Sequence, residues 1–130
     1  MRLGFASAAL LALCGCSRPP LLVGSPMEIT ETPTTVRLDQ PVTPTGPNWE
    51  LCFEFDLPGH SHSTGGIEAA LIAASGQSYP LVDAELDRRG ESVVCQIGRV
   101  DASEPGGVVF ESIQLRAATR LRVRQIRGGA

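Results

Sequence analysis

The sequence predicts an all-β protein, specifically a small antiparallel β-sandwich with an immunoglobulin-like or jelly-roll-like outline. From Thr34 onward the chain contains about six to eight short β-favouring segments separated by turn signals, a spacing typical of β-sandwiches. No long segment has the 3.6-residue apolar period of an amphipathic helix. The hydrophobic content of 42% is enough for one core, although aromatic residues make up only 5%.

The clearest strand follows Asn48. Over nine positions, large apolar residues alternate with polar residues or cysteine, which predicts a strand with one buried and one wetter face. Three of the six aromatic residues lie on its apolar side, so we expect this strand to be central to the core. The apolar positions are Trp49, Leu51, Phe53, Phe55 and Leu57, and the others are Glu50, Cys52, Glu54 and Asp56.

The remaining strands are expected before and after this one in the sequence. Residues 34–38 are β-favouring and lie among prolines, which suits a first strand at a sheet edge. Later strands are expected over 67–74, 79–86, 91–100, 108–115 and 119–126, with Val93, Cys95 and Ile97 on one face of their strand. Between the second and third of these, residues 87–90 predict a hairpin loop in which Gly90 takes a left-handed conformation.

The amino terminus has the pattern of a secretory signal. The chain begins with Met1-Arg2, is apolar from Leu3 to Leu13, and then becomes polar and proline-rich. An apolar run of about eleven residues is too short to cross a bilayer, which needs about 20. The segment Leu13-Cys14-Gly15-Cys16 resembles the lipobox of bacterial lipoprotein precursors.

That resemblance implies cleavage of residues 1–15 and attachment of lipid to Cys16. Cys14 fits less well, because the bulky Leu13 precedes it. Since Ser17 rather than aspartate follows Cys16, the resemblance also implies an anchor in the outer membrane of a Gram-negative bacterium, on the periplasmic side of the envelope. We expect residues 16–33 to form a flexible proline-rich tether, with 17–25 spanning roughly 25–30 Å, and residues 34–127 to form the β-domain.

Cys52 and Cys95 are the two cysteines left after these assignments. In a chain sent to an oxidising compartment, two remaining thiols predict a disulfide. Closing a loop of about 43 residues would stabilise the fold by roughly 3–4 kcal/mol. Because Cys52 shares the polar side of its strand with Glu50 and Glu54, the disulfide lies either on the outer face beside a neighbouring strand or is turned inward by a bulge.

Two further groups are candidate sites. His60 and His62 are weak candidates for metal ligands, because two ligands in a glycine- and serine-rich loop are too few for a stable zinc site. Arg120, Arg122 and Arg124 share one strand face and are a candidate docking patch for an acidic partner or anionic lipid. The alternative, which we favour, is that they pair across strands with acidic residues such as Glu50, Glu54 and Asp56.

These features predict a lipid-anchored, non-catalytic binding or assembly module with a protein partner in the envelope. No nucleophile elbow of the G-x-S-x-G type is present, so we expect neither an enzyme nor a bound cofactor. The formal net charge of −3 gives no reason to expect nucleic acid as a partner. The alternatives are a carbohydrate- or peptidoglycan-binding module that stacks sugars on Trp49 or Tyr79, and a weak metal-binding lipoprotein that uses His60 and His62.

Overall fold

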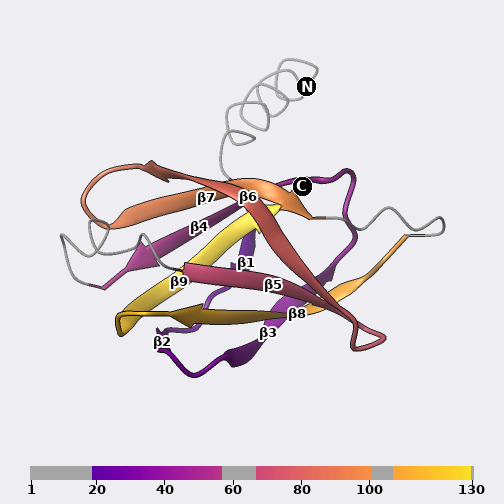
Figure 1. Cartoon of the computed structure of the whole chain (residues 1–130), viewed down its shortest axis with the longest axis horizontal. Helices are drawn as coiled ribbons and strands as arrows, with labels where there is room; N and C mark the ends of the chain where they lie inside the picture. The colour runs from indigo at the N-terminus through magenta and orange to yellow at the C-terminus, as the bar shows by residue number, and fades with distance from the viewer. Residues whose placement is uncertain (1–18, 57–66, 101–106, 130) are drawn as a thin grey trace, which may run out of the picture.

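The computed structural model describes residues 19–56, 67–100 and 107–129, and these residues form nine β-strands (Figure 1). The strands are β1 (Leu21–Val23), β2 (Met27–Ile29), β3 (Thr34–Val42), β4 (Asn48–Phe55), β5 (Ile67–Ala73), β6 (Ser78–Arg88), β7 (Val93–Val100), β8 (Phe110–Ala117) and β9 (Leu121–Gly129). The all-β prediction is therefore confirmed.

All strand pairs are antiparallel, and the sheet curls until its two ends nearly meet. The strand order is β1-β9-β4-β7-β6-β5-β8-β3, and β2 pairs with β9 in line with β1. The long strand β6 pairs first with β5 and then with β7, so it connects the two halves of the sheet (Figure 1). Across the remaining seam, the backbone N–H of Gly24 donates to Asp39 Oδ2 at 2.9 Å. The result is a sandwich-like, nearly closed barrel.

The core lies on the concave side of this curled sheet. The four predicted apolar positions of β4 that the structure describes, Trp49, Leu51, Phe53 and Phe55, are all buried. Trp49 and Tyr79 each pack edge-to-face on Phe110, with ring centroids 5.6 and 5.5 Å apart. This is a favourable arrangement for aromatic pairs, and it places β4 at the centre of the fold as the alternation predicted.

The segment expected to be a tether differs in the structure. Leu21–Val23 and Met27–Ile29 are strands on β9, and Leu22, Val23 and Ile29 are buried in the core. The proline-rich composition suggested extended, solvated chain, but these apolar side chains gain more by covering the edge of the core than by remaining in water. The β-domain therefore includes residues 21–29, which lie before the expected start at residue 34.

The last strand, expected over 119–126, runs to Gly129, two residues past the expected end of the β-domain at 127. Gly128 lies against β4 so closely that a Cβ atom there would overlap the backbone oxygen of Glu50. Only glycine permits that approach without a backbone shift. The neighbouring Gly129 has no such contact, because the nearest atom to a Cβ there would be 3.7 Å away.

The side of β7 that carries Val93, Cys95 and Ile97 faces away from the core. Val93, Cys95 and Ile97 do share one side, but Ile97 is 42% exposed, whereas Val94 and Val100 are buried in the core. On the inner side, Gln96 donates from Nε2 to the backbone oxygen of Ile67 at 2.9 Å, which satisfies part of a buried amide. The turn before β7 holds Gly90 at φ 91°, so the predicted left-handed glycine is confirmed.

Candidate functional site

The predicted disulfide is present and joins two adjacent central strands. Cys52 of β4 and Cys95 of β7 are directly opposite one another, with Cα atoms 3.9 Å apart. The β4–β7 ladder has no register shift, since it runs without interruption from Asn48↔Arg99 to Glu54↔Val93. No bulge turns Cys52 inward, so the disulfide lies on the outer face. Of the two alternatives left open by the sequence, the outer-face placement is the correct one.

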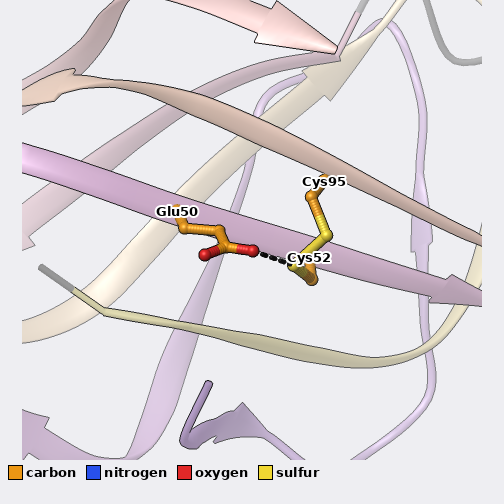
Figure 2. A group of neighbouring side chains, drawn as sticks. All are labelled: Glu50, Cys52 and Cys95. Carbon is orange, nitrogen blue, oxygen red and sulfur yellow. Dashed lines mark hydrogen bonds between the residues drawn. A yellow bond between two sulfur atoms is a disulfide. The ribbon is translucent and has the colours of Figure 1, made fainter. Parts of the chain in front are cut away.

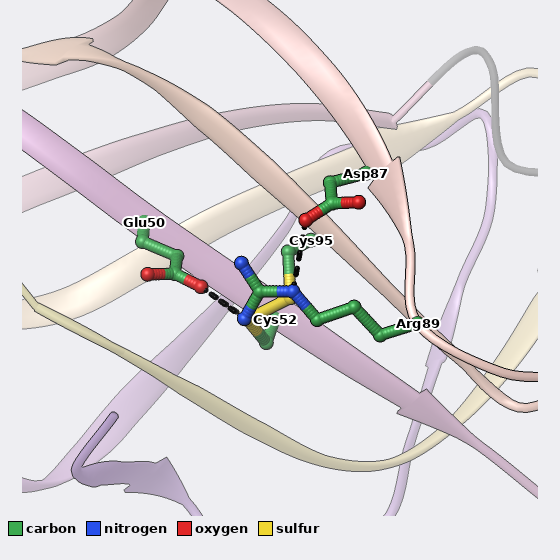
Figure 3. A network of polar contacts seen from close by, with 5 residues as sticks. All are labelled: Glu50, Cys52, Asp87, Arg89 and Cys95. Carbon is green, nitrogen blue, oxygen red and sulfur yellow. Dashed lines mark hydrogen bonds and ion pairs between the residues drawn. A yellow bond between two sulfur atoms is a disulfide. The ribbon is translucent and has the colours of Figure 1, made fainter. Parts of the chain in front are cut away.

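Although it lies on the outer face, this disulfide is largely shielded from solvent. Cys52 is 7% exposed and Cys95 is fully buried. The cover includes the side chain of Arg89, which extends from the turn after β6 over the two sulfur atoms (Figure 3). Its Nη1 atom lies 3.9 Å from Cys52 Sγ.

Arg89 is held in this position by two carboxylates. Its Nη1 atom forms an ion pair with Glu50 Oε1 at 2.5 Å, and its Nε atom donates to Asp87 Oδ2 at 2.9 Å (Figure 3). Asp87 is also the β6 residue directly opposite Cys95, so the sheet register places it beside the sulfurs. The hydrogen bond that Arg89 donates to Asp87 is the largest cause that raises the pKa of the Arg89 guanidinium above its ordinary value. Contact with Glu50 adds to this rise, and partial burial opposes it.

Glu50 is close to the disulfide itself as well as to Arg89. Its Oε1 atom lies 3.4 Å from Cys52 Sγ (Figure 2). A sulfur in a disulfide has no proton to donate, so in the oxidised protein this is a close contact between an acceptor and a sulfur. The carboxylate oxygen and the two sulfurs lie within 4.8 Å of one another. Carboxylate and thiolate groups are both metal ligands, so these three residues have the chemistry to hold a metal once the sulfurs are free.

A small pocket of about 200 Å³ opens beside the disulfide. Among its lining residues, Gln125 donates from Nε2 to Glu54 Oε2 at 2.7 Å. Arg127, also in the lining, donates from Nη1 to the backbone oxygen of Pro19 at 3.3 Å. Pro19 lines the same pocket as Cys52 and Cys95, so it lies close to the disulfide.

The three arginines of the candidate docking patch are each paired with an acidic residue of the domain. Arg122 and Arg124 contact acidic residues of the β4 segment, and Arg120 contacts β2. The N···O distances are 3.0 Å for Arg120–Glu28, 3.9 Å for Arg122–Asp56 and 3.7 Å for Arg124–Glu54. This is the cross-strand pairing that we favoured, with one change of partner. Glu50 pairs with Arg89 instead of with one of these arginines, and Glu28 is the partner of Arg120.

The aromatic residues considered for sugar stacking are not on the surface. Trp49 is 1% exposed and Tyr79 is 7% exposed, and both rings pack on Phe110. A stacking platform needs an open ring face, so neither residue can serve as one in this fold. Cys16, His60 and His62 lie outside the described residues.

Sequence reasoning did not find the group formed by Glu50, Asp87 and Arg89 around the disulfide. The sequence places Asp87 and Arg89 in a hairpin loop, and it predicts partners for Glu50 only among Arg120, Arg122 and Arg124. Their two-residue spacing does place Asp87 and Arg89 on the same side of an extended chain. The signal that was missing is the register of β6 on β7, which brings Asp87 opposite Cys95.

Comparison with known proteins adds no assignment, because the chain matches no protein-family profile, no curated protein and no solved structure. In the part of the chain that the structure describes, no helix is long and apolar enough to cross a membrane.

Proposed function

We propose that this chain is a lipid-anchored protein of the bacterial cell envelope, most simply of the outer membrane, whose β-domain is a non-catalytic binding or assembly module for another envelope protein. The lipid is carried by Cys16 after removal of residues 1–15. The observation that carries the proposal is the combination of a lipobox-like segment with a disulfide joining the two remaining cysteines.

The disulfide supports a location outside the cytoplasm. Disulfides form and persist in oxidising compartments such as the periplasm and are rare where thiols are kept reduced. Cys52 and Cys95 are 43 residues apart in the sequence, yet they face each other across a regular ladder, so their pairing needs no rearrangement of the sheet. This fits a chain that is exported and oxidised outside the cytoplasm.

The position of β1 supports a close attachment to the membrane. Only four residues, 17–20, separate Cys16 from the start of β1 at Leu21. At about 3.3–3.6 Å per residue, a fully extended chain of that length spans roughly 14 Å. The domain is thus held about half as far from the bilayer as the 25–30 Å expected from the longer tether, with the β1–β9 end of the sheet nearest the lipid.

A protein partner is the best-supported ligand class for the module. Arg120, Arg122 and Arg124 are engaged with acidic residues of the domain, which weakens their role as a free patch for lipid or an acidic partner. The buried positions of Trp49 and Tyr79 weaken the carbohydrate-binding alternative. The anchor then serves to hold a compact β-domain at the membrane surface, where it meets other envelope proteins.

The experiment compares two cysteine variants in fractionated envelopes. Cys16→Ser should abolish lipidation and release the domain or leave uncleaved precursor, whereas the matched control Cys14→Ser should remain lipidated in the membrane fraction. Crosslinking followed by affinity purification of the lipidated protein should then recover a reproducible envelope partner that the Cys16→Ser variant loses. Equal membrane retention of both variants would contradict the anchor. A lipidated protein that crosslinks to no envelope protein would contradict the binding role.

A further inference from the structure

Glu50, Cys52 and Cys95 bring one carboxylate and two sulfurs together on the outer face of β4 and β7. The three potential ligand atoms lie within 4.8 Å of one another (Figure 2). Zinc bonds of about 2.3 Å to sulfur and 2.0–2.2 Å to oxygen in tetrahedral geometry place ligand atoms about 3.5–3.8 Å apart. We propose that, when the disulfide is reduced, the two thiolates and the Glu50 carboxylate bind one zinc ion. This goes beyond the proposed function and does not depend on the lipid anchor.

The oxidised protein already holds a cation at this place. The Arg89 guanidinium is paired with Glu50 Oε1 and lies 3.9 Å from Cys52 Sγ, so it occupies the region between the same carboxylate and sulfur (Figure 3). The Arg89 side chain is 42% exposed and comes from a turn rather than from the centre of a strand, so it can swing away without disturbing the sheet. Zinc therefore replaces the guanidinium as the counter-charge of the site.

The sheet keeps the ligands in position without the disulfide. The cysteine pair is one of seven consecutive partner pairs in the β4–β7 ladder, and the ladder of β4 with β9 supports the other side of the same strand. Glu50 and Cys52 are two residues apart on one strand, so their side chains point to the same face. Three protein ligands leave a fourth zinc position, and the neighbouring pocket of about 200 Å³ has room for a water molecule there.

The chemistry requires a reductant, and an external dithiol is sufficient. Its two thiols supply two electrons and two protons, the Cys52–Cys95 sulfur–sulfur bond breaks, and the reductant becomes a disulfide. Zinc then displaces the two thiol protons, which are released to solvent. Because the same sulfurs form either the disulfide or the metal site, the two states exclude one another, and bound zinc protects the thiols from oxidation.

The test uses the full chain with four background changes, Cys14→Ser, Cys16→Ser, His60→Ala and His62→Ala. Cys52 and Cys95 are then the only cysteines, and the two histidines contribute no ligand. The protein is reduced with a phosphine, freed of reductant without air, and titrated with zinc by calorimetry. We expect one zinc per reduced chain with release of two protons, and no binding to the oxidised chain. Cobalt in place of zinc should give the absorption of thiolate–metal charge transfer.

Two carboxylate variants distinguish Glu50, the proposed zinc ligand, from the nearby Asp87, which is not a ligand. Loss of an outer-shell partner costs metal sites about 10–100-fold in affinity, so Glu50→Gln, which removes a direct ligand, should weaken zinc binding by roughly tenfold or more. Asp87→Asn is the matched control, because Asp87 also contacts Arg89 but is not one of the three ligand groups. It should leave the affinity unchanged or raise it by loosening Arg89.

Circular dichroism is recorded with and without zinc to follow the fold. If the reduced chain stays folded and binds no zinc, or binds it equally well after Cys95→Ser, the proposal is wrong. If reduction unfolds the chain, zinc should restore the β-sheet spectrum, and failure to restore it would equally overturn the proposal.

Discussion

Two arginine-containing regions of this protein contact carboxylates in different ways. At β9, Arg120 directly before the strand and Arg122 and Arg124 within it each reach one carboxylate, and we call these three the β9 arginines. Their side chains are 65–76% exposed. Over β4 and β7, the single side chain of Arg89 joins two carboxylates and covers a buried disulfide. The same ion-pair chemistry therefore has a small, screened effect in the first region. In the second it positions one side chain over a buried disulfide.

The difference arises from what lies beneath the charges. The β9 arginines extend from an outer strand face into water, where solvent and salt weaken an ion pair to about 0–1 kcal/mol. Arg89 lies above two sulfurs that the sheet register brings together, so its aliphatic stem and guanidinium exclude water from them. Charged residues on a sheet surface thus contribute according to what they cover, more than according to their number.

The largest effect is expected from removing the disulfide. Replacing both Cys52 and Cys95 with serine should lower the free energy of unfolding by about 3–4 kcal/mol, because the unfolded chain regains the entropy of a loop of about 43 residues. Denaturant unfolding of the oxidised protein and of the double variant measures the difference. The reduced wild-type protein, without zinc, is the control and should resemble the variant. A loss below about 1 kcal/mol would mean that the bridge adds little to the ladder around it.

Removing Arg89 should have an intermediate effect. Arg89→Ala breaks two ion pairs and exposes the disulfide, and because the side chain is 42% exposed we expect a loss of only about 1 kcal/mol in unfolding free energy. Arg37→Ala, at an exposed position of β3, is the control for the change in net charge. Thermal unfolding of the two variants at the same pH provides the measurement. Equal melting temperatures for both would show that the guanidinium stabilises nothing at this place.

The three β9 arginines should together contribute no more than Arg89 alone. Replacing Arg120, Arg122 and Arg124 with serine should cost about 0.5–1 kcal/mol in total, since exposed pairs contribute little and the three distances are 3.0–3.9 Å. High salt should reduce the difference from wild type. A triple variant with unchanged stability but lost envelope partners would instead make this strand the docking surface.

The smallest effect is expected at Arg122. Its contact with Asp56 is 3.9 Å long and its side chain is 69% exposed, so Arg122→Ser should change stability by less than about 0.5 kcal/mol. Arg120→Ser, which removes the 3.0 Å contact with Glu28, should cost slightly more. A double-mutant cycle with Glu28→Gln measures that pair directly. A coupling energy above about 1 kcal/mol would remove the contrast between the two regions.

Local patterns in the sequence predicted several parts of the fold. The alternation after Asn48 fixed both the position and the buried face of β4, because a two-residue period with large apolar side chains leaves little choice of face. The left-handed Gly90 followed from the turn chemistry of residues 87–90. The disulfide followed from the expected export to an oxidising compartment and from the fact that Cys52 and Cys95 are the two cysteines left there.

The parts that sequence reasoning missed depend on contacts between distant segments. β1 and β2 were assigned to a tether because prolines surround them, but their partner β9 is about 100 residues away. The group around the disulfide needs the registers of three strands at once. Only those registers bring Glu50, Asp87 and Arg89 to the two sulfurs.

The most direct test of the account is the rate at which a phosphine reduces the Cys52–Cys95 disulfide in the folded protein. Three proteins are compared: the wild type, Arg89→Ala and the β9 triple serine variant, which serves as a control of similar stability. If Arg89 covers the bridge, reduction should be clearly faster in Arg89→Ala, while the triple variant should stay close to the wild type. Equal acceleration in both variants would assign the effect to general unfolding. An unchanged rate in Arg89→Ala would show that the guanidinium does not cover the disulfide.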